Sequence, residues 1–260
     1  MINEKLKQHA QAALLAGVRR DGRKLDEFRP IHIERGISST AHGSARIRVG
    51  DVVVVAGTKL EVGKPYADTP DQGSLVVNAE LLPLSNPSYE AGPPSNESIE
   101  LARVVDRTIR EAKTIDLKAL SIVPAESMWV VGVDIAPINA NGNLLDISAL
   151  VAMAAITDAR LPELVNGVPQ YEKLTTKRLP LANVPILVTV YKIGNQFLVD
   201  PTEEEEQYCD ARLSIATLDS GKLCALQKAG AGPLSLSDID TMTEMAVRIG
   251  KQLRALVVKQ

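Results

Sequence analysis

The sequence predicts an α+β protein made of two similar halves. Runs of β-branched residues are followed by a helical pattern, and this order occurs once before and once after a stretch with several prolines. The length of 260 residues and an apolar content of 45% allow a sizeable core. We therefore expect an N-terminal helix and connector over 1–29, a first half over 30–161, a linker over 162–184 and a second half over 185–260.

The N-terminal part and the first half contain three predicted helices. Residues 3–17 have an amphipathic pattern that ends at Gly17, and residues 96–115 follow a capping residue, Ser95 or Asn96. An almost entirely apolar pattern over 144–161 predicts a buried helix. The predicted strands cover residues 31–36, 44–50, 51–63, 74–83 and 127–138.

The second half repeats strands and then a helix. A loop with Pro162, Pro169 and Pro180 is expected to separate the halves. Strands are predicted over 185–194 and 195–200, and a hairpin over 212–230. The last helix begins near Ser237 and places these residues on one face: Met242, Ala246, Ile249, Leu253 and Leu256.

Composition and charge restrict the possible partners. A net charge of −3 means that any contact with RNA or DNA must be a local patch or be shared with a partner, and 3% aromatic residues argue against a base-stacking platform. The two cysteines form no zinc pattern with His9, His32 and His42, and they fit a reducing compartment. The sequence shows neither a signal-type segment nor an apolar run that crosses a bilayer, so we expect a cytoplasmic protein without a membrane partner, metal or cofactor.

The stretch "VDPTEEEEQYCDARLSIAT" (199–217) clusters carboxylates directly after a predicted strand. They are Asp200, the four glutamates from Glu203 to Glu206, and Asp210. Carboxylates in such a position can hold a metal or transfer a proton. They can equally form a solvated acidic loop, and the residue pattern alone leaves both interpretations open.

The predicted helix over 96–115 carries a stripe of arginines opposite its apolar side. At about 100° per residue, Arg103, Arg107 and Arg110 share one arc. The apolar side consists of Leu101, Val104, Val105, Thr108 and Ala112, and the residues that flank the arginines are Glu100, Asp106 and Glu111. Guanidinium groups can bind the phosphates of a nucleic acid, but spacing alone favours a solvated face with ion pairs.

A strand, a glycine turn and a helix occur in "DIAPINANGNLLDIS" (134–148), an order that can bind phosphate at the helix N-terminus. Here the turn at Gly142 is followed by Leu144 and Leu145, with no hydroxyl or cation to complete the site. Asp146 adds an anion that would compete with phosphate. An ordinary turn and cap is therefore the preferred interpretation.

Together these segments resemble the ribonuclease PH family, and more narrowly the non-catalytic ribonuclease PH-like subunits of the archaeal exosome. The resemblance covers nearly the whole chain in order, and its third and fourth stretches are the most specific to the exosome subunits. It rests on "RRDGRKLDEFRPIHIERG" (19–36), "HGSARIRVGDVVVVAGTKLEVG" (42–63), "YEAGPPSNESIELARVVDRTIRE" (89–111), "VVGVDIAPINANGNLLDISAL" (130–150) and "FLVDPTEEEEQYCDARLSIAT" (197–217).

The resemblance implies a fold of two βαβ-type halves in which mixed sheets pack against helices. It also implies phosphorolytic removal of nucleotides from RNA 3′ ends, a reaction that needs two aspartates and a phosphate-binding loop. In this chain the aspartate positions fall on Glu206 and Arg212, and the phosphate-loop positions fall on Leu144 and Leu145. Arginine cannot act as an acid, so we expect no catalysis, and Glu203 to Glu205 become a solvated loop.

The resemblance reverses the interpretation of two arginines. It implies that Arg103 and Arg107 contact single-stranded RNA, whereas the role of Arg110 stays open. The partners that it implies are a catalytic ribonuclease PH-like subunit, alternating with this chain in a six-membered ring with three copies of each, and cap subunits with RNA-binding domains. The alternative is a self-sufficient phosphate-dependent exoribonuclease that uses Glu206 with Asp200 or Asp210.

Overall fold

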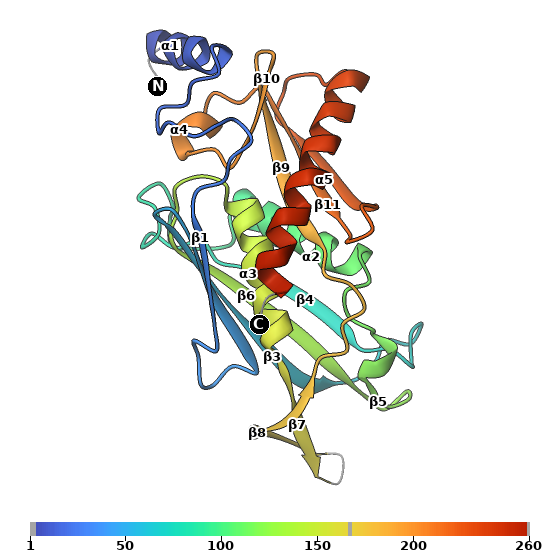
Figure 1. Cartoon of the computed structure of the whole chain (residues 1–260). Coiled ribbons are helices and arrows are strands. Elements are labelled where there is room, and N and C mark those ends of the chain that lie inside the picture. The colour runs from blue at the N-terminus through green and yellow to red at the C-terminus, as the bar shows by residue number, and fades with distance from the viewer. Residues whose placement is uncertain (1–3, 166–167, 259–260) are drawn as a thin grey trace.

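In the computed structural model, which describes residues 4–165 and 168–258, two large sheets enclose a central helix (Figure 1). The helices are α1 (Glu4–Leu15), α2 (Asn96–Glu111), α3 (Leu144–Asp158), α4 (Glu203–Glu206) and α5 (Leu236–Val258), with a 3-10 turn η1 (Lys118–Leu120). The strands are β1 (Ile31–Arg35), β2 (Gly43–Val49), β3 (Val52–Gly63), β4 (Ser74–Ala79), β5 (Ser121–Val123), β6 (Ser127–Asn139), β7 (Arg160–Val165), β8 (Val168–Arg178), β9 (Ile186–Ile193), β10 (Gln196–Val199), β11 (Ala211–Thr217) and β12 (Leu223–Ala229).

The first sheet is mixed and has the order β1-β2-β3-β6-β4, with β5 paired to β6. Its strands are antiparallel except for β4 and β6, which run parallel because helix α2 lies between them in the chain. Burial alternates along β2 and β3, so that one face points to the core. This half therefore contains the expected βαβ crossover.

The second sheet has the order β10-β9-β11-β12 and is entirely antiparallel. Helix α5 packs on β9 and β11. The α+β class is confirmed. Among the described residues the parallel crossover occurs in the first half alone, because the second half is built from hairpins followed by one helix.

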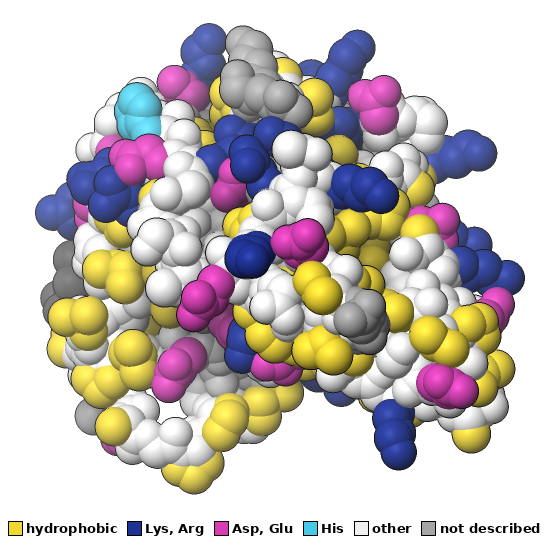
Figure 2. Space-filling view, turned by 90° about the horizontal axis from the view of Figure 1, so that it is seen from below, with side chains coloured by type: hydrophobic (Ala, Val, Ile, Leu, Met, Phe, Trp, Pro, Cys, Tyr) yellow, Lys and Arg dark blue, Asp and Glu magenta, His cyan; other side chains and the backbone are white. Residues whose placement is uncertain are grey.

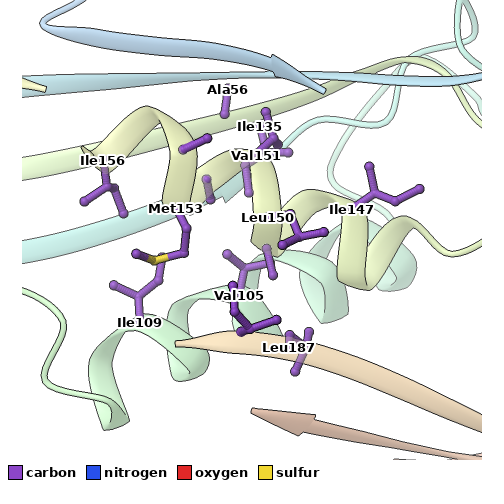
Figure 3. Packing of buried hydrophobic residues seen from close by; sticks show 14 of the residues in the cluster. Ala56, Val105, Ile109, Ile135, Ile147, Leu150, Val151, Met153, Ile156 and Leu187 are labelled. Atoms are coloured by element: carbon purple, nitrogen blue, oxygen red, sulfur yellow. The ribbon is translucent and has the colours of Figure 1, made fainter. Parts of the chain in front are cut away.

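Helix α3 lies between the sheets and forms the centre of the core (Figure 3). It contacts β2, β3 and β6 on one side and β9 on the other, and it also packs against α2. Every residue from Leu145 to Ile156 is buried. A helix enclosed on all sides must be apolar all round, which explains the sequence pattern.

Two predicted details are wrong. The expected loop after the first half instead contains the hairpin of β7 and β8, whose register shifts at Pro162 accommodate a residue that cannot donate to the ladder. In α5 the last buried apolar residue is Val257, while Leu256 is 37% exposed. After Leu253, the next buried position of the helix is therefore i+4 (Val257) and not i+3 (Leu256).

We predict that Leu150→Ala lowers the free energy of unfolding by about 2–5 kcal/mol, because Leu150 is 1% exposed and a cavity would remain between the sheets. Urea denaturation measures the loss. The matched control is Leu84→Ala, since Leu84 is 73% exposed and should change stability by less than about 0.5 kcal/mol. Equal losses in both variants would contradict the placement of α3.

Candidate functional site

Asp200 begins the acidic stretch, and its carboxylate is fully buried. Arg29 donates to it from its backbone nitrogen, Nε and Nη2, with Nη2 2.7 Å from Oδ1. Arg23 Nη1 and Asn143 Nδ2 also donate to it, each at 2.9 Å. Burial alone would raise the pKa of Asp200, but the hydrogen bonds from Arg29 outweigh it and hold this pKa below its ordinary value. Asp200 is therefore an ionised structural anchor, with its acceptor positions occupied by the protein.

The glutamates that follow form the short helix α4 rather than a solvated loop. Thr202 and Glu205 make a capping box, with the Thr202 oxygen accepting from the Glu205 nitrogen. Glu205 also binds the buried guanidinium of Arg19 through two hydrogen bonds, Nε to Oε1 at 2.9 Å and Nη2 to Oε2 at 2.6 Å. The prediction of a solvated loop is thus wrong for Glu205, because a partner 186 residues away in sequence buries it.

The side chain of Glu206, the last residue of α4, lies against the N-terminal end of α3. Its Oε1 accepts from the backbone nitrogen of Asn143 at 2.9 Å and from the Tyr191 hydroxyl at 2.8 Å. Asn143 has a left-handed φ of 56°, and its side chain makes no cap for the helix. A carboxylate of the protein thus takes a helix N-terminal donor that an anionic ligand would use in a phosphate site. Burial raises the pKa of Glu206, and its two hydrogen bonds oppose that rise.

A small pocket opens beside this carboxylate, between α2, α4 and the turn before α3. Its charged lining consists of Glu97, Glu100, Glu203, Glu206 and Arg212, and Leu144 and Leu145 supply apolar walls. Arg212 Nη2 binds Glu100 Oε1 at 2.8 Å, so the single cation of the lining is already paired. The field in the pocket therefore opposes a phosphate dianion.

Asp146 does not face the N-terminus of α3, where it was expected to compete with phosphate, but points to the second sheet. It is fully buried and accepts from the backbone nitrogen and the hydroxyl of Thr189 on β9, at 2.9 and 2.7 Å. Burial raises its pKa to about 7, although the bonds from Thr189 oppose the rise. The anion that competes for the helix N-terminus is thus Glu206, while Asp146 links α3 to the second sheet.

In the arginine stripe on α2, Arg103 and Arg107 make no ion pair among the described residues, whereas Arg110 makes one. Arg103 is exposed, and Arg107 is exposed with Nη1 donating to Gln227 Oε1 on β12 at 2.9 Å. Arg110 binds Asp106 at 2.7 Å and donates to the Leu75 carbonyl oxygen at 2.9 Å. The opposite side of the helix is buried as predicted. The structure therefore keeps Arg103 and Arg107 one helical turn apart at the surface, away from the carboxylate pocket, whose lining they do not join.

Sequence reasoning missed the cations that order this region. Arg19, Arg23 and Arg29 lie in a connector that reads as polar and solvated, yet Arg19 and Arg29 are 2% and 8% exposed. No local pattern pairs them with residues about 180 positions later. Asp210 accepts from the Gly194 nitrogen at 2.7 Å, so it holds a turn rather than joining Asp200.

Residues 4–165 and 168–258 contain no group of three or more histidine, cysteine or acidic side chains arranged to hold a metal ion. No described helix is both long and apolar enough to span a bilayer.

Residues 27–162 match the first domain of the 3′ exoribonuclease family, and residues 183–249 match its second domain. The chain therefore belongs to the 3′ exoribonuclease family, of the ribonuclease PH type. The α+β architecture and the two matched domains agree with that class.

Within this family, the chain is similar to curated proteins that are named as exosome components. The chain is 42% identical to "Exosome complex component Rrp42" of Methanopyrus kandleri, covering 98% of this chain and 97% of the relative. It is 40% identical to the protein of the same name from Thermoplasma acidophilum, covering 98% and 95%. Among solved structures, a chain of the Archaeoglobus fulgidus exosome with RNA bound to the active site matches with a TM-score of 0.90 and 40% identity, covering 97% of both chains. A chain of an archaeal exosome core matches with a TM-score of 0.86 and 37% identity, covering 98% and 96%.

We predict that Asp200→Asn lowers the free energy of unfolding by about 3–5 kcal/mol at pH 7, because buried guanidinium groups would lose their counter-charge. The pKa of Asp200 is lowered in the folded state, so its contribution is complete above the unfolded value of about 3.9 and is lost as pH falls below it. Urea denaturation at neutral and acidic pH should show the gap between wild type and variant closing below about pH 4.

The exposed Asp219 provides the control, since Asp219→Asn alters no hydrogen bond or ion pair found among the described residues. A gap for Asp200→Asn that stays constant across this pH range would rule out the ionised pair.

Proposed function

We propose that this chain is a non-catalytic subunit of an RNA-degrading exosome, which shapes the active site of a phosphorolytic partner and helps to bind RNA. The observation that carries the proposal is Glu206, whose carboxylate binds the backbone nitrogen of Asn143 at the start of α3. The names of the relatives, exosome complex components, support the assembly.

Three features of the site, two of the pocket and one of Asp200, argue against phosphorolysis by this chain alone. Phosphate would meet four carboxylates, and the one guanidinium is paired with Glu100. Leu144 and Leu145 offer no hydrogen-bond donor from their side chains. Asp200, one of the two aspartates that the alternative enzyme could pair with Glu206, is buried under two arginines and cannot reach a substrate. Because phosphoryl transfer depends mainly on electrostatic stabilisation and positioning, this set of residues removes the activity.

RNA contact is assigned to Arg103 and Arg107. They lie four residues apart on α2, so about 6 Å separates them along the helix axis. Both are exposed, and their guanidinium groups match phosphate oxygens. Figure 2 shows basic and acidic side chains interspersed on the face that it presents, which fits a local rather than a global basic site.

The partners follow from the same proposal. A catalytic ribonuclease PH-like subunit would alternate with this chain in a six-membered ring, three copies of each, and cap subunits with RNA-binding domains would cover one side. The solved exosome with RNA bound to its active site, which contains a similar chain, supports membership in an RNA-binding exosome assembly. The near-neutral charge of this chain agrees with a binding field supplied jointly with its partner.

We predict that the purified single chain releases no nucleoside diphosphate from a 3′-tailed RNA in the presence of phosphate. Thin-layer chromatography of the products measures the release. The catalytic-type partner, assayed together with this chain, serves as the positive control. Diphosphate release by the single chain would establish the self-sufficient enzyme instead.

We predict that Arg103→Glu with Arg107→Glu, in the ring reconstituted with the catalytic-type subunit, weakens RNA binding about tenfold or more and reduces the salt dependence of the affinity. Assembly should persist, because neither side chain is buried. Fluorescence anisotropy at several salt concentrations, with mass measurement of the ring, tests both points. The matched control is Arg46→Glu with Arg48→Glu, an equal charge change on exposed residues of β2. An equal loss of RNA affinity in both double variants would contradict the assignment of Arg103 and Arg107 to RNA binding.

A further inference from the structure

Strand β4 forms one border of the first sheet, and its outer edge is free. It pairs with β6 on one side and has no second neighbouring strand among the described residues. The Leu75 oxygen accepts from Arg110, on the side away from β6, whereas the Glu80 nitrogen donates to the Ile135 oxygen of β6. Because backbone groups alternate along a strand, Val77 and Ala79 direct their N–H and C=O groups outward with Leu75.

These outward groups have no partner in the parts of the chain that are described. No hydrogen bond outside the ladder reaches the backbone of Val77 or Ala79, and both residues are partly exposed. Backbone donors and acceptors at a protein surface without a partner are a template for another strand. Arg110 blocks the edge at Leu75, so the open part begins at Val77.

A groove runs along this open part. Val77 lines a shallow groove with Arg103 and Arg107, and Ala79 lines a larger one that shares Ala102 and Arg103 with the first. The larger groove is bounded by residues 78–82, by the loop of residues 88–95 and by the first turns of α2. An extended chain that pairs with β4 would therefore pass into the larger groove.

The larger groove is acidic at its rim and apolar within. Four exposed carboxylates line it, against one guanidinium, that of Arg103; they belong to Glu80, Glu90, Glu97 and Asp134. Its apolar lining includes Leu81, Ala136 and the 45% exposed Ile99. This combination of charge and apolar surface fits a peptide with basic and apolar side chains and opposes a polyanion.

We propose that the free edge of β4 and the acidic groove beyond it bind an extended basic segment of a partner protein, which adds to the sheet as a further strand. Main-chain hydrogen bonds to Val77 and Ala79 provide affinity, and the carboxylates of Glu80 and Glu90 select basic side chains. This surface adjoins the RNA assignment, because Arg103 and Arg107 line the shallow groove beside Val77, whereas the acidic rim excludes RNA from the larger groove. The peptide test below contains no RNA and changes neither arginine, so its outcome does not depend on the RNA assignment.

The test uses the full chain and two short fluorescein-labelled peptides, one alternating lysine with valine and one alternating glutamate with valine. Fluorescence anisotropy should show saturable binding of the lysine peptide and none of the glutamate peptide. Val77→Pro removes an outward N–H without breaking the β6 ladder, and it should weaken binding about fivefold or more. Val77→Thr keeps the N–H and should bind as the wild type does.

Charge reversal provides a second variant that does not touch the backbone. Glu80→Lys with Glu90→Lys changes two exposed side chains that make no hydrogen bond or ion pair among the described residues, so the fold should persist. It should weaken the lysine peptide about tenfold. The equivalent change on the β7–β8 hairpin, Glu163→Lys with Glu172→Lys, should leave binding unchanged. Absence of lysine-peptide binding, equal binding of both peptides, or wild-type affinity in the Glu80 and Glu90 variant would each overturn the proposal.

Discussion

The contact between the buried carboxylate of Asp200 and the guanidinium of Arg29 determines how the candidate site is arranged. It joins three segments that are distant in sequence, since Arg29 also donates to the Asn141 oxygen at 2.9 Å and Asn143 donates to Asp200. Asp200 itself has a left-handed φ of 46°, a conformation that these bonds help to compensate. The end of β10, the connector after α1 and the turn before α3 therefore hold one another in position. Because α4 follows Asp200 directly, this arrangement also brings Glu206 to the start of α3.

The consequence for function is that a carboxylate of the protein, that of Glu206, lies where a phosphate ligand would otherwise bind. In a phosphorolytic site, donors at a helix N-terminus and nearby cations hold phosphate. Here the carboxylate of Glu206 takes one such donor, and Arg212 is engaged by Glu100. In the proposed function, the fold around the site is kept while its chemistry is lost. In that function, the exposed Arg103 and Arg107 on α2 bind and position RNA beside the active site of another subunit.

Much of the fold could be predicted because the spacing of apolar residues along the sequence indicates which side of a helix or strand is buried. The apolar pattern of α3 and the buried side of α2 follow directly from their environment. The site could be predicted only in part. Leu144, Leu145 and Arg212 mark the missing chemistry by their residue types, but the partner of Glu205 is Arg19, which no local pattern identifies. The same holds for the edge of β4, since strand order depends on long-range pairing. The solvated-loop interpretation is wrong for Glu205 because its partner lies far away in the sequence, whereas Glu204 is exposed.

We propose that the protein's own carboxylates occupy the place where an active family member would bind phosphate. Titration of inorganic phosphate into the single chain, followed by the shift of its melting temperature, tests this most directly. We expect no saturable stabilisation by phosphate beyond that given by sodium chloride at equal ionic strength. A saturable rise that is abolished by substituting Arg212 would show that the pocket accepts phosphate, and it would contradict the account.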